Sequence, residues 1–400
     1  MRTPPASEHA TGAAAALVYL AVLAAFINMY LPQAILPVLG REFGVSPSTA
    51  SLSVSVMILG IAVSSLVMGP LSDRIGRKPL LVGCALALTG PSLVCALAPS
   101  WPVLLAGRLV QGLFIPGLTA VGVAYIAEEF PEGRVGRLLG GYVAATVLGG
   151  LLSRVLAGLI AEAAGWRWAF VLGAANALAV GGALTRLRPS RRFVPSSALR
   201  GAYAGMLAHL RSPRLVGGFA VGFSLFFAFM AVFTYLPFYV EAPPFGFSPG
   251  EVGLVYLVYA AGVVSSPLAG ALAARVGPRG VMVLGLGTAL VAGGFTLLPS
   301  APLLIAALLA LCFGNFAAQS TATAFVATQA EGERAGASAL YLFAYYVGGS
   351  LGAFVPGLAF ARSGWGGVLL LSTAALLAGM SAAALLCRAD EPVSGTQPSP

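Results

Sequence analysis

Apolar segments of about 20 residues, separated by short polar turns, occupy almost the whole chain. A helix needs about 20 apolar residues to cross a hydrocarbon core of about 30 Å. Strands of a membrane barrel would be shorter, about 9–11 residues, and would alternate polar and apolar positions, which these segments do not. The sequence therefore predicts an all-α membrane protein whose twelve spans lie at 14–38, 49–70, 80–98, 102–127, 138–161, 168–186, 215–237, 250–272, 280–299, 302–327, 337–361 and 366–387.

The overall composition agrees with membrane helices. The chain is 58% hydrophobic and only 9% charged, whereas a soluble domain is about 45–50% apolar and about 25% charged. The 51 glycines fit close helix contacts, since small residues let backbones approach. The first apolar run exceeds the core of about 7–15 residues expected for a signal peptide, so we expect an uncleaved first helix.

The net charge of +9 indicates how the protein is oriented in the membrane. Most Lys and Arg residues fall in turns on one side of the predicted helices, and positive charge is retained in the cytoplasm. An even number of spans then places both termini in the cytoplasm, and a nucleic-acid partner is not expected. The predicted segments are a tail (1–13), a six-helix half (14–186), a basic linker (187–214), a second half (215–387) and a tail (388–400).

The turn after the second span concentrates charge. Asp73, Arg74, Arg77 and Lys78 lie within six residues, between glycines that include Gly69 and Gly76. The order resembles the signature loop of the major facilitator superfamily, G-x-L-x-D-R-x-G-R-K/R. The resemblance implies the major facilitator fold of twelve transmembrane helices in two six-helix pseudo-symmetric halves, and a transporter that works by alternating access.

An internal repeat supports the two halves. The loop pattern, Arg134-x-Gly136 and Gly165-Trp166 each recur about 200 residues later, which predicts a duplicated six-helix unit with a substrate site between the copies. The second loop has Ala274 where the first has Asp73, so the two loops are not equivalent. The recurring landmarks are Gly270 to Gly277, Arg334-x-Gly336 and Gly364-Trp365.

The first loop is the predicted cytoplasmic gate. The resemblance implies that Asp73 meets the start of span 11 near Gly336, in the opposite half. Arg74 and Arg77 are expected to pair with acidic residues after span 4, near Arg134, and such contacts would form when the cytoplasmic side closes. The alternative is a plain orientation signal. The acidic candidates are Glu128, Glu129 and Glu132.

Arg108 and Gln111 share one face of span 4. An arginine inside a membrane span is costly and therefore suggests a function. The segment resembles the R-x-x-Q-G motif of the superfamily, whose arginine is implicated in proton coupling. The alternative is an arginine whose head group reaches the outer surface.

Arg154 in span 5 is the second intramembrane cation. Drug/proton antiporters of the superfamily have G-x-x-x-G-P-x-x-G-G here, but this chain has Ser153-Arg154 in place of the Gly-Pro. This resembles the YnfM-like branch of bacterial efflux proteins. The resemblance implies export of small amphipathic compounds across the bacterial plasma membrane.

The energy source stays open, because no Asp or Glu lies in the middle of any predicted span. Proton coupling would need a glutamate at a helix end or a water path organised by arginine. The cationic interior leaves a uniporter or symporter for an organic anion or sugar as an alternative.

Polar residues at helical spacing are candidates for the substrate cavity, with hydrogen bonding between helices as the alternative role. No P-loop, HExxH or GxSxG motif is present, so we expect neither an enzyme nor an ATP-driven pump, and no cofactor or metal. The expected partners are a small-molecule substrate and the bilayer, in a monomer, with protons left open. A non-transporting sensor on the same fold is the alternative of another class. The cavity candidates are Asn28, Gln33, Tyr142, Thr146, Ser153, Asn315, Gln319, Tyr341 and Tyr345.

Overall fold

The computed structural model describes residues 8–190, 206–330 and 334–387, and within these ranges every regular element is a helix. Ten helical stretches are long and apolar enough to cross a membrane. Two of them are interrupted, at Gly277 and Gly364, where the backbone leaves the helical conformation and two helices meet at a kink. The structure therefore confirms the all-α membrane fold and is consistent with twelve spans.

The N-terminal half begins with a broken span. A proline lacks the N–H that would continue the helical hydrogen bonds, and the first helix ends just before Pro32. The predicted first span, 14–38, lies within the single apolar stretch Gly12–Phe43, and the helix inside it is interrupted at Pro32. The elements are α1 (Glu8–Tyr30), η1 (Gln33–Ile35), α2 (Leu36–Phe43), α3 (Pro47–Ile75), α4 (Arg77–Ala96), α5 (Trp101–Glu129), α6 (Glu132–Ala163) and α7 (Trp166–Leu184).

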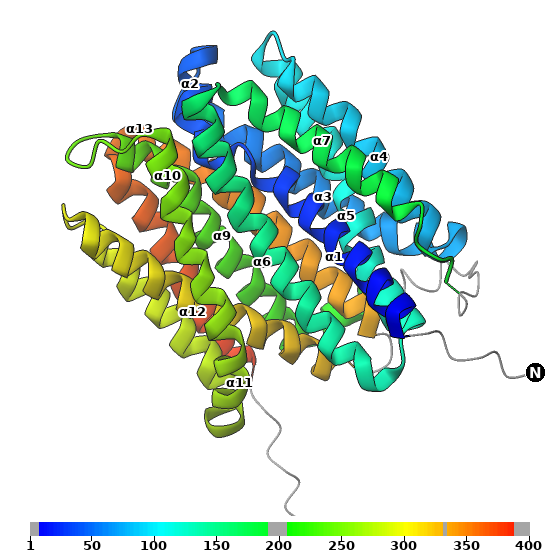
Figure 1. The fold of residues 1–400 in the computed structure, drawn as a ribbon. Coiled ribbons are helices and arrows are strands. Elements are labelled where there is room, and N and C mark those ends of the chain that lie inside the picture. Colours follow the sequence, from blue (N-terminus) through cyan, green and yellow to red (C-terminus); the bar gives the residue numbers. More distant parts are fainter. Residues whose placement is uncertain (1–7, 191–205, 331–333, 388–400) are drawn as a thin grey trace, which may run out of the picture.

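The C-terminal half, which runs from green through yellow to red in Figure 1, lies beside the first half. Its eighth span consists of α10, η3 and the part of α11 before Gly277. The elements are η2 (His209–Arg211), α9 (Pro213–Glu241), α10 (Pro249–Val255), η3 (Tyr256–Ala260), α11 (Ala261–Phe295), α12 (Ala301–Gln329) and α13 (Arg334–Leu386).

The backbone repeats the duplication seen in the sequence. Positive φ angles occur only at glycines among the described residues, and these glycines form pairs about 200 residues apart. One pair was not recognised in the sequence, although the same Ser-Pro helix start follows each glycine two residues later. The pairs are Gly44 with Gly246, Gly76 with Gly277, and Gly165 with Gly364.

The two halves meet along a seam, which we define as α3 and α6 of the first half against α13 and α10 of the second. We call the end of the bundle that carries residues 69–78 the loop end, and the opposite end the far end. The start of α1 and the end of α13 both lie at the loop end (Figure 1), which the charge pattern predicts to be cytoplasmic.

Candidate functional site

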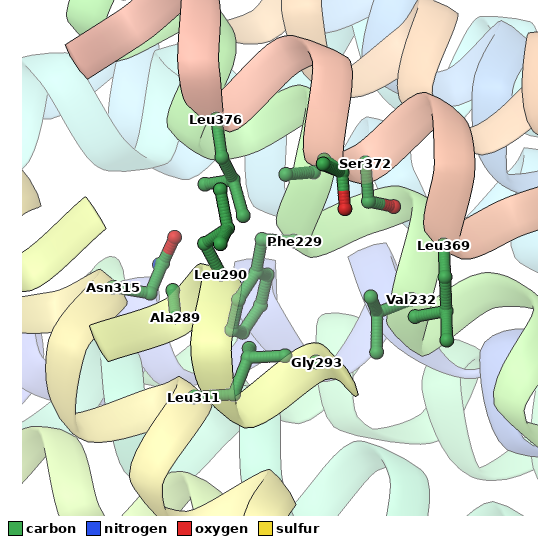
Figure 2. Close-up of a pocket in the computed structure, with 12 residues that line it drawn as sticks. Phe229, Val232, Ala289, Leu290, Gly293, Leu311, Asn315, Leu369, Ser372 and Leu376 are labelled. Atoms are coloured by element: carbon green, nitrogen blue, oxygen red, sulfur yellow. The ribbon is translucent and has the colours of Figure 1, made fainter. Parts of the chain in front are cut away.

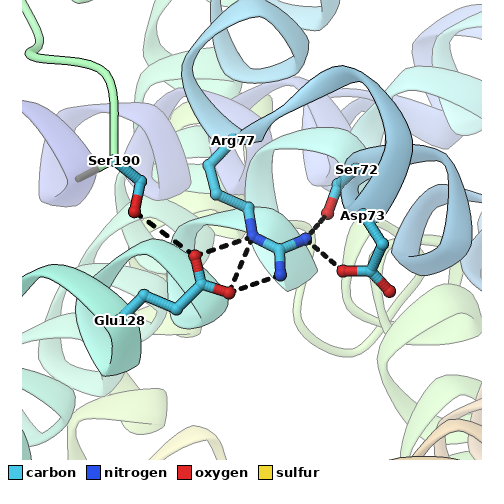
Figure 3. Close-up of polar contacts among 5 residues, drawn as sticks. All are labelled: Ser72, Asp73, Arg77, Glu128 and Ser190. Carbon is cyan, nitrogen blue, oxygen red and sulfur yellow. Dashed lines mark hydrogen bonds and ion pairs between the residues drawn. The ribbon is translucent and has the colours of Figure 1, made fainter. Parts of the chain in front are cut away.

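One buried arginine organises the charged loop. Gly76 has a φ of 99°, a conformation that favours glycine, and Arg77 follows as the first residue of α4. The Arg77 side chain is 10% exposed and lies 2.6 Å from the Asp73 carboxylate. Its Nε also donates to both carboxylate oxygens of Glu128 at 3.1 Å, as Figure 3 shows. Because Nη2 donates to Glu128 as well, the pair is a charge-assisted fork.

Glu128 extends this network beyond the loop. Ser190 Oγ, beyond the end of α7, donates to its carboxylate at 3.4 Å. One turn earlier in α5, the Tyr125 hydroxyl donates to the backbone oxygen of Arg188 at 3.0 Å. The network therefore connects α4, α5 and the chain after α7 within the N-terminal half.

The other predicted gate residues lie in several different environments. The Asp73 carboxylate pairs with Arg77, in its own half. A side chain added at Gly336, the predicted region of contact, would meet Met206 Cα at 3.2 Å. Of the remaining gate residues, Gly69, Lys78 and Glu129 are half-buried, Arg74 and Arg134 are exposed, and Glu132 has a side chain outside the described set.

Arg108 is fully buried and bridges three helices through backbone oxygens. Its guanidinium donates to Ser53 O at 2.8 Å, Asn28 O at 2.8 Å and Met29 O at 2.6 Å. The last carbonyl groups of a helix lack intrahelical partners, and Pro32 has no N–H to offer Asn28 O. Arg108 thus supplies the donors missing where the first span breaks, and its head group does not reach the outer surface.

Gln111 and Asn28 lie in the same buried network. Arg108 Nη1 donates to Gln111 Oε1 at 2.7 Å, and Gln111 Nε2 donates to Ser92 Oγ at 2.8 Å. Ser92 Oγ donates to Asn28 Oδ1 at 3.0 Å, and Asn28 Nδ2 donates to Gly173 O at 3.2 Å. The structure therefore places both predicted residues inside the N-terminal half, where they join α1, α4, α5 and α7.

Arg154 lies on the seam. It is 1% exposed, and its Nε donates to Gln33 Oε1 at 2.7 Å. Gln33 Nε2 donates in turn to Thr234 of the other half at 3.2 Å. Arg154 Nη1 donates to Gly150 O, one turn back toward the loop end. Arg154 Nη2 is buried and has no hydrogen-bond partner within 8–190, 206–330 and 334–387.

Three tyrosines from both halves surround this guanidinium. Its central carbon lies 3.9 Å from the ring centre of Tyr30, 4.5 Å from that of Tyr259 and 5.1 Å from that of Tyr256. Such distances give cation–π attraction. We call these rings the tyrosine cage. Sequence reasoning missed it, because the three residues lie on α1 and η3, far from Arg154 in the chain.

Further contacts join the halves, and their residues lie in the far-end portion of each element. A cation and a carboxylate pair at the surface, while hydroxyl groups meet in the interior. The pairs are Arg41 with Glu241 at 2.6 Å, Ser55 with Ser350 at 3.0 Å, Tyr235 with Ser51 at 2.8 Å, and Glu162 with Ser248 at 3.0 Å and Gly250 N at 2.7 Å.

The remaining cavity candidates of α6 bond within the N-terminal half. The hydroxyl of Ser153 donates to Gly150 O at 2.9 Å, and that of Thr146 donates to Val143 O at 2.6 Å. The hydroxyl of Tyr142 donates to Thr119 O at 2.7 Å. These contacts satisfy the hydroxyl donors inside the helix bundle.

The C-terminal half has an apolar pocket between α9, α11, α12 and the second part of α13 (Figure 2). Asn315 and Ser372 are polar groups among its mostly apolar lining. Farther along α12, Gln319 Oε1 is buried without a partner. The pocket therefore belongs to one half, and its Phe229 packs against Tyr259 of the tyrosine cage with ring centroids 5.0 Å apart.

Tyr341 and Tyr345 contribute to an aromatic wall on α13. Their rings stack with centroids 6.1 Å apart, and Tyr345 stacks on Phe226 of α9 at 4.0 Å. The Tyr341 hydroxyl lies 3.3 Å from Thr323 Oγ1. Tyr345 remains half-buried, so part of this wall is accessible.

Comparison with known proteins gives one family. The family model described as Major Facilitator Superfamily matches residues 18–243 and 242–400. The inner membrane transport protein YnfM of Escherichia coli (strain K12) is 35% identical over 90% of this chain and 88% of its own length. The MFS-type transporter YybF of Bacillus subtilis (strain 168) is 32% identical over 91% of this chain and 90% of its own.

Solved structures share the fold. A bacterial homologue of the human lysosomal transporter Spinster, in an inward-facing and occupied conformation, superposes with a TM-score of 0.76 at 17% identity. It covers 95% of this chain and 96% of its own. A D-xylose–proton symporter superposes with a TM-score of 0.73 at 19% identity, over 92% and 97% of the two chains.

Proposed function

This chain belongs to the major facilitator superfamily and is a multi-pass membrane transporter, and we propose that it exports small amphipathic compounds by alternating access. The proposal places the loop end in the cytoplasm, because the basic residues of the chain gather in the turns on that side. Both ends of the chain then lie in the cytoplasm of a bacterial cell, and the membrane is its plasma membrane.

The contacts between the halves support an inward-facing state for this structure. Hydrogen bonds and an ion pair connect the halves near the far end. At the loop end, Asp73, Arg77 and Glu128 pair within one half. Closing the cytoplasmic side would bring the start of α13 to Asp73, and the two sets of contacts would alternate in strength between the states.

The proposed substrate class, small amphipathic compounds, rests on one observation, the aromatic side chains that line the seam. Phe226 and Tyr345 stack at 4.0 Å, and Tyr345 meets Tyr346 edge to face at 5.6 Å. Tyr30 of the tyrosine cage adds an aromatic ring from the opposite half. Such surfaces bind flat apolar groups, while hydroxyl groups at their edges accept polar ones.

Transport in proteoliposomes tests this proposal. Purified protein is supplied with amphiphilic cations, neutral drugs, organic anions and sugars, with and without an imposed pH gradient. We expect amphipathic compounds to move and sugars to stay behind, and a response to the gradient would establish proton coupling. Movement of sugars alone would contradict the proposal.

A uniporter or symporter for an organic anion or sugar is the second candidate. The unpaired donor of Arg154 favours an anionic substrate, since Arg is suited to carboxylate recognition. The same panel separates the two, because this candidate predicts uptake of polar anions or sugars that lack an apolar part.

A further inference from the structure

The two arginines inside the membrane differ in how completely they are bonded. Arg108 makes three hydrogen bonds to backbone oxygens and one to Gln111. Arg154 makes two, to Gln33 and Gly150, and its Nη2 is buried without a partner. Buried polar groups in native proteins are almost always bonded, so an exception calls for a ligand or a function.

Among the described residues, no carboxylate forms an ion pair with Arg154. None of the 13 acidic residues lies in the middle of a span, and the guanidinium lies near the middle of the 32-residue helix α6, at the level of Gly150. Arginine does not lose its proton in proteins. The tyrosine rings attract the cation but leave its N–H donor unbonded.

A second buried polar group without a hydrogen-bond partner among the described residues lies in the tyrosine cage. The Tyr259 hydroxyl is buried and has no hydrogen-bond partner, while its ring is 4.5 Å from the guanidinium carbon. The Tyr256 hydroxyl, by contrast, donates to Phe233 O at 2.7 Å. A guanidinium N–H and a phenol O–H offered together are the donors that an oxyanion accepts.

We propose that Arg154 and Tyr259 bind the carboxylate of the transported compound, so that the substrate is an amphipathic carboxylate. This assignment rests on the proposed function and narrows it. The apolar part of the substrate would lie on the aromatic wall, and its carboxylate would take the place of tyrosine faces around the cation.

The cage also connects binding to the cycle. Arg154 belongs to the first half and Tyr256 and Tyr259 to the second, so these contacts hold the seam together near the middle of α6. A carboxylate that draws the guanidinium away from these rings weakens the seam and favours the state open at the far end. Binding from the cytoplasm would thereby promote release on the other side, as export requires.

The test compares two probes of the same shape, naphthoate and its neutral amide, in which an NH2 donor replaces one carboxylate oxygen. We expect proteoliposomes to transport naphthoate about tenfold faster, as one charge-assisted hydrogen bond predicts. Arg154→Gln should abolish this preference, and Arg154→Lys should restore part of it. Tyr259→Phe, which removes only the hydroxyl, should weaken naphthoate binding several-fold and leave the amide unchanged.

Direct binding of naphthoate to detergent-purified protein, measured by calorimetry, separates this inference from the proposed function. Arg167→Gln, at an arginine 46% exposed, is the matched control and should bind naphthoate normally. Equal transport of both probes by wild type and Arg154→Gln would refute the carboxylate site and leave export standing. Absence of transport with Arg154-dependent binding would refute export and leave the site. The assignment would be overturned if Arg154→Gln and Tyr259→Phe bound naphthoate as tightly as the wild type. It would also be overturned if chloride at the same concentration as naphthoate abolished the binding.

Discussion

Gly158 offers a direct test of which state the structure represents. A Cβ added there would lie 3.0 Å from Gly253 Cα and 3.2 Å from Gly253 N, and closer still to Pro249 O. These are backbone atoms of the opposite half, so they can yield only if α6 and α10 separate. Gly158→Ala should therefore destabilise the far-end-closed state and leave a state with separated helices unaffected.

The size of the effect follows from overpacking. Inserting one carbon into a well-packed contact costs about 1–3 kcal/mol, which shifts a two-state equilibrium about 5–150-fold. The shift should favour opening at the far end. Gly83→Ala is the matched control, because a Cβ at this helical glycine meets no atom within 4 Å.

Distances between spin labels across the far end measure the shift. Cysteines introduced by Leu97→Cys and Pro299→Cys place labels in exposed turns of opposite halves, on a background in which the four buried native cysteines are replaced. We expect Gly158→Ala to increase the population of long distances and Gly83→Ala to leave it unchanged. An unchanged distribution in folded Gly158→Ala protein would refute the steric argument.

Three further substitutions test other parts of the molecule. Arg108→Leu removes the donor to the buried carbonyl oxygens of Asn28 and Met29 at the break in the first span, at about 1–3 kcal/mol each, so folded protein should be largely lost in size-exclusion chromatography. Asp73→Asn keeps the fold and removes an ion-pair partner of Arg77, so transport should slow while the melting temperature stays nearly constant. Tyr235→Phe removes hydrogen bonds to Ser51 and Ala353 O, worth about 1 kcal/mol each, and should increase labelling of far-end cysteines.

The membrane spans could be predicted from the sequence because each is a local property. Length, hydrophobicity and flanking charge together specify a span. The breaks at Gly277 and Gly364 fall in the turns that the sequence predicted between spans. The break at Pro32 lies inside the predicted first span and arises because proline lacks an N–H.

The pairing of residues across the seam could not be predicted. Gly158 and Gly253 look like any other helical glycines in the sequence, yet they set the closest approach of α6 and α10. The repeat of Gly44 at Gly246 was present in the sequence. It could have been found by searching for the Ser-Pro helix start that follows each of them.

Residue type alone could not separate the roles of the two buried arginines. Arg108 lies beside the carbonyl groups that the break at Pro32 leaves free. Its guanidinium therefore supplies the hydrogen bonds that the backbone of the first span lacks there. A neutral donor of the same shape would serve there, because the carbonyl groups need N–H donors and no net charge. Arg154 donates to Gly150 O and to the amide oxygen of Gln33, and its Nη2 remains without a hydrogen-bond partner among the described residues. An unneutralised cation inside a membrane is costly, and the carboxylate proposed above would supply the counterion that Arg154 lacks among the described residues.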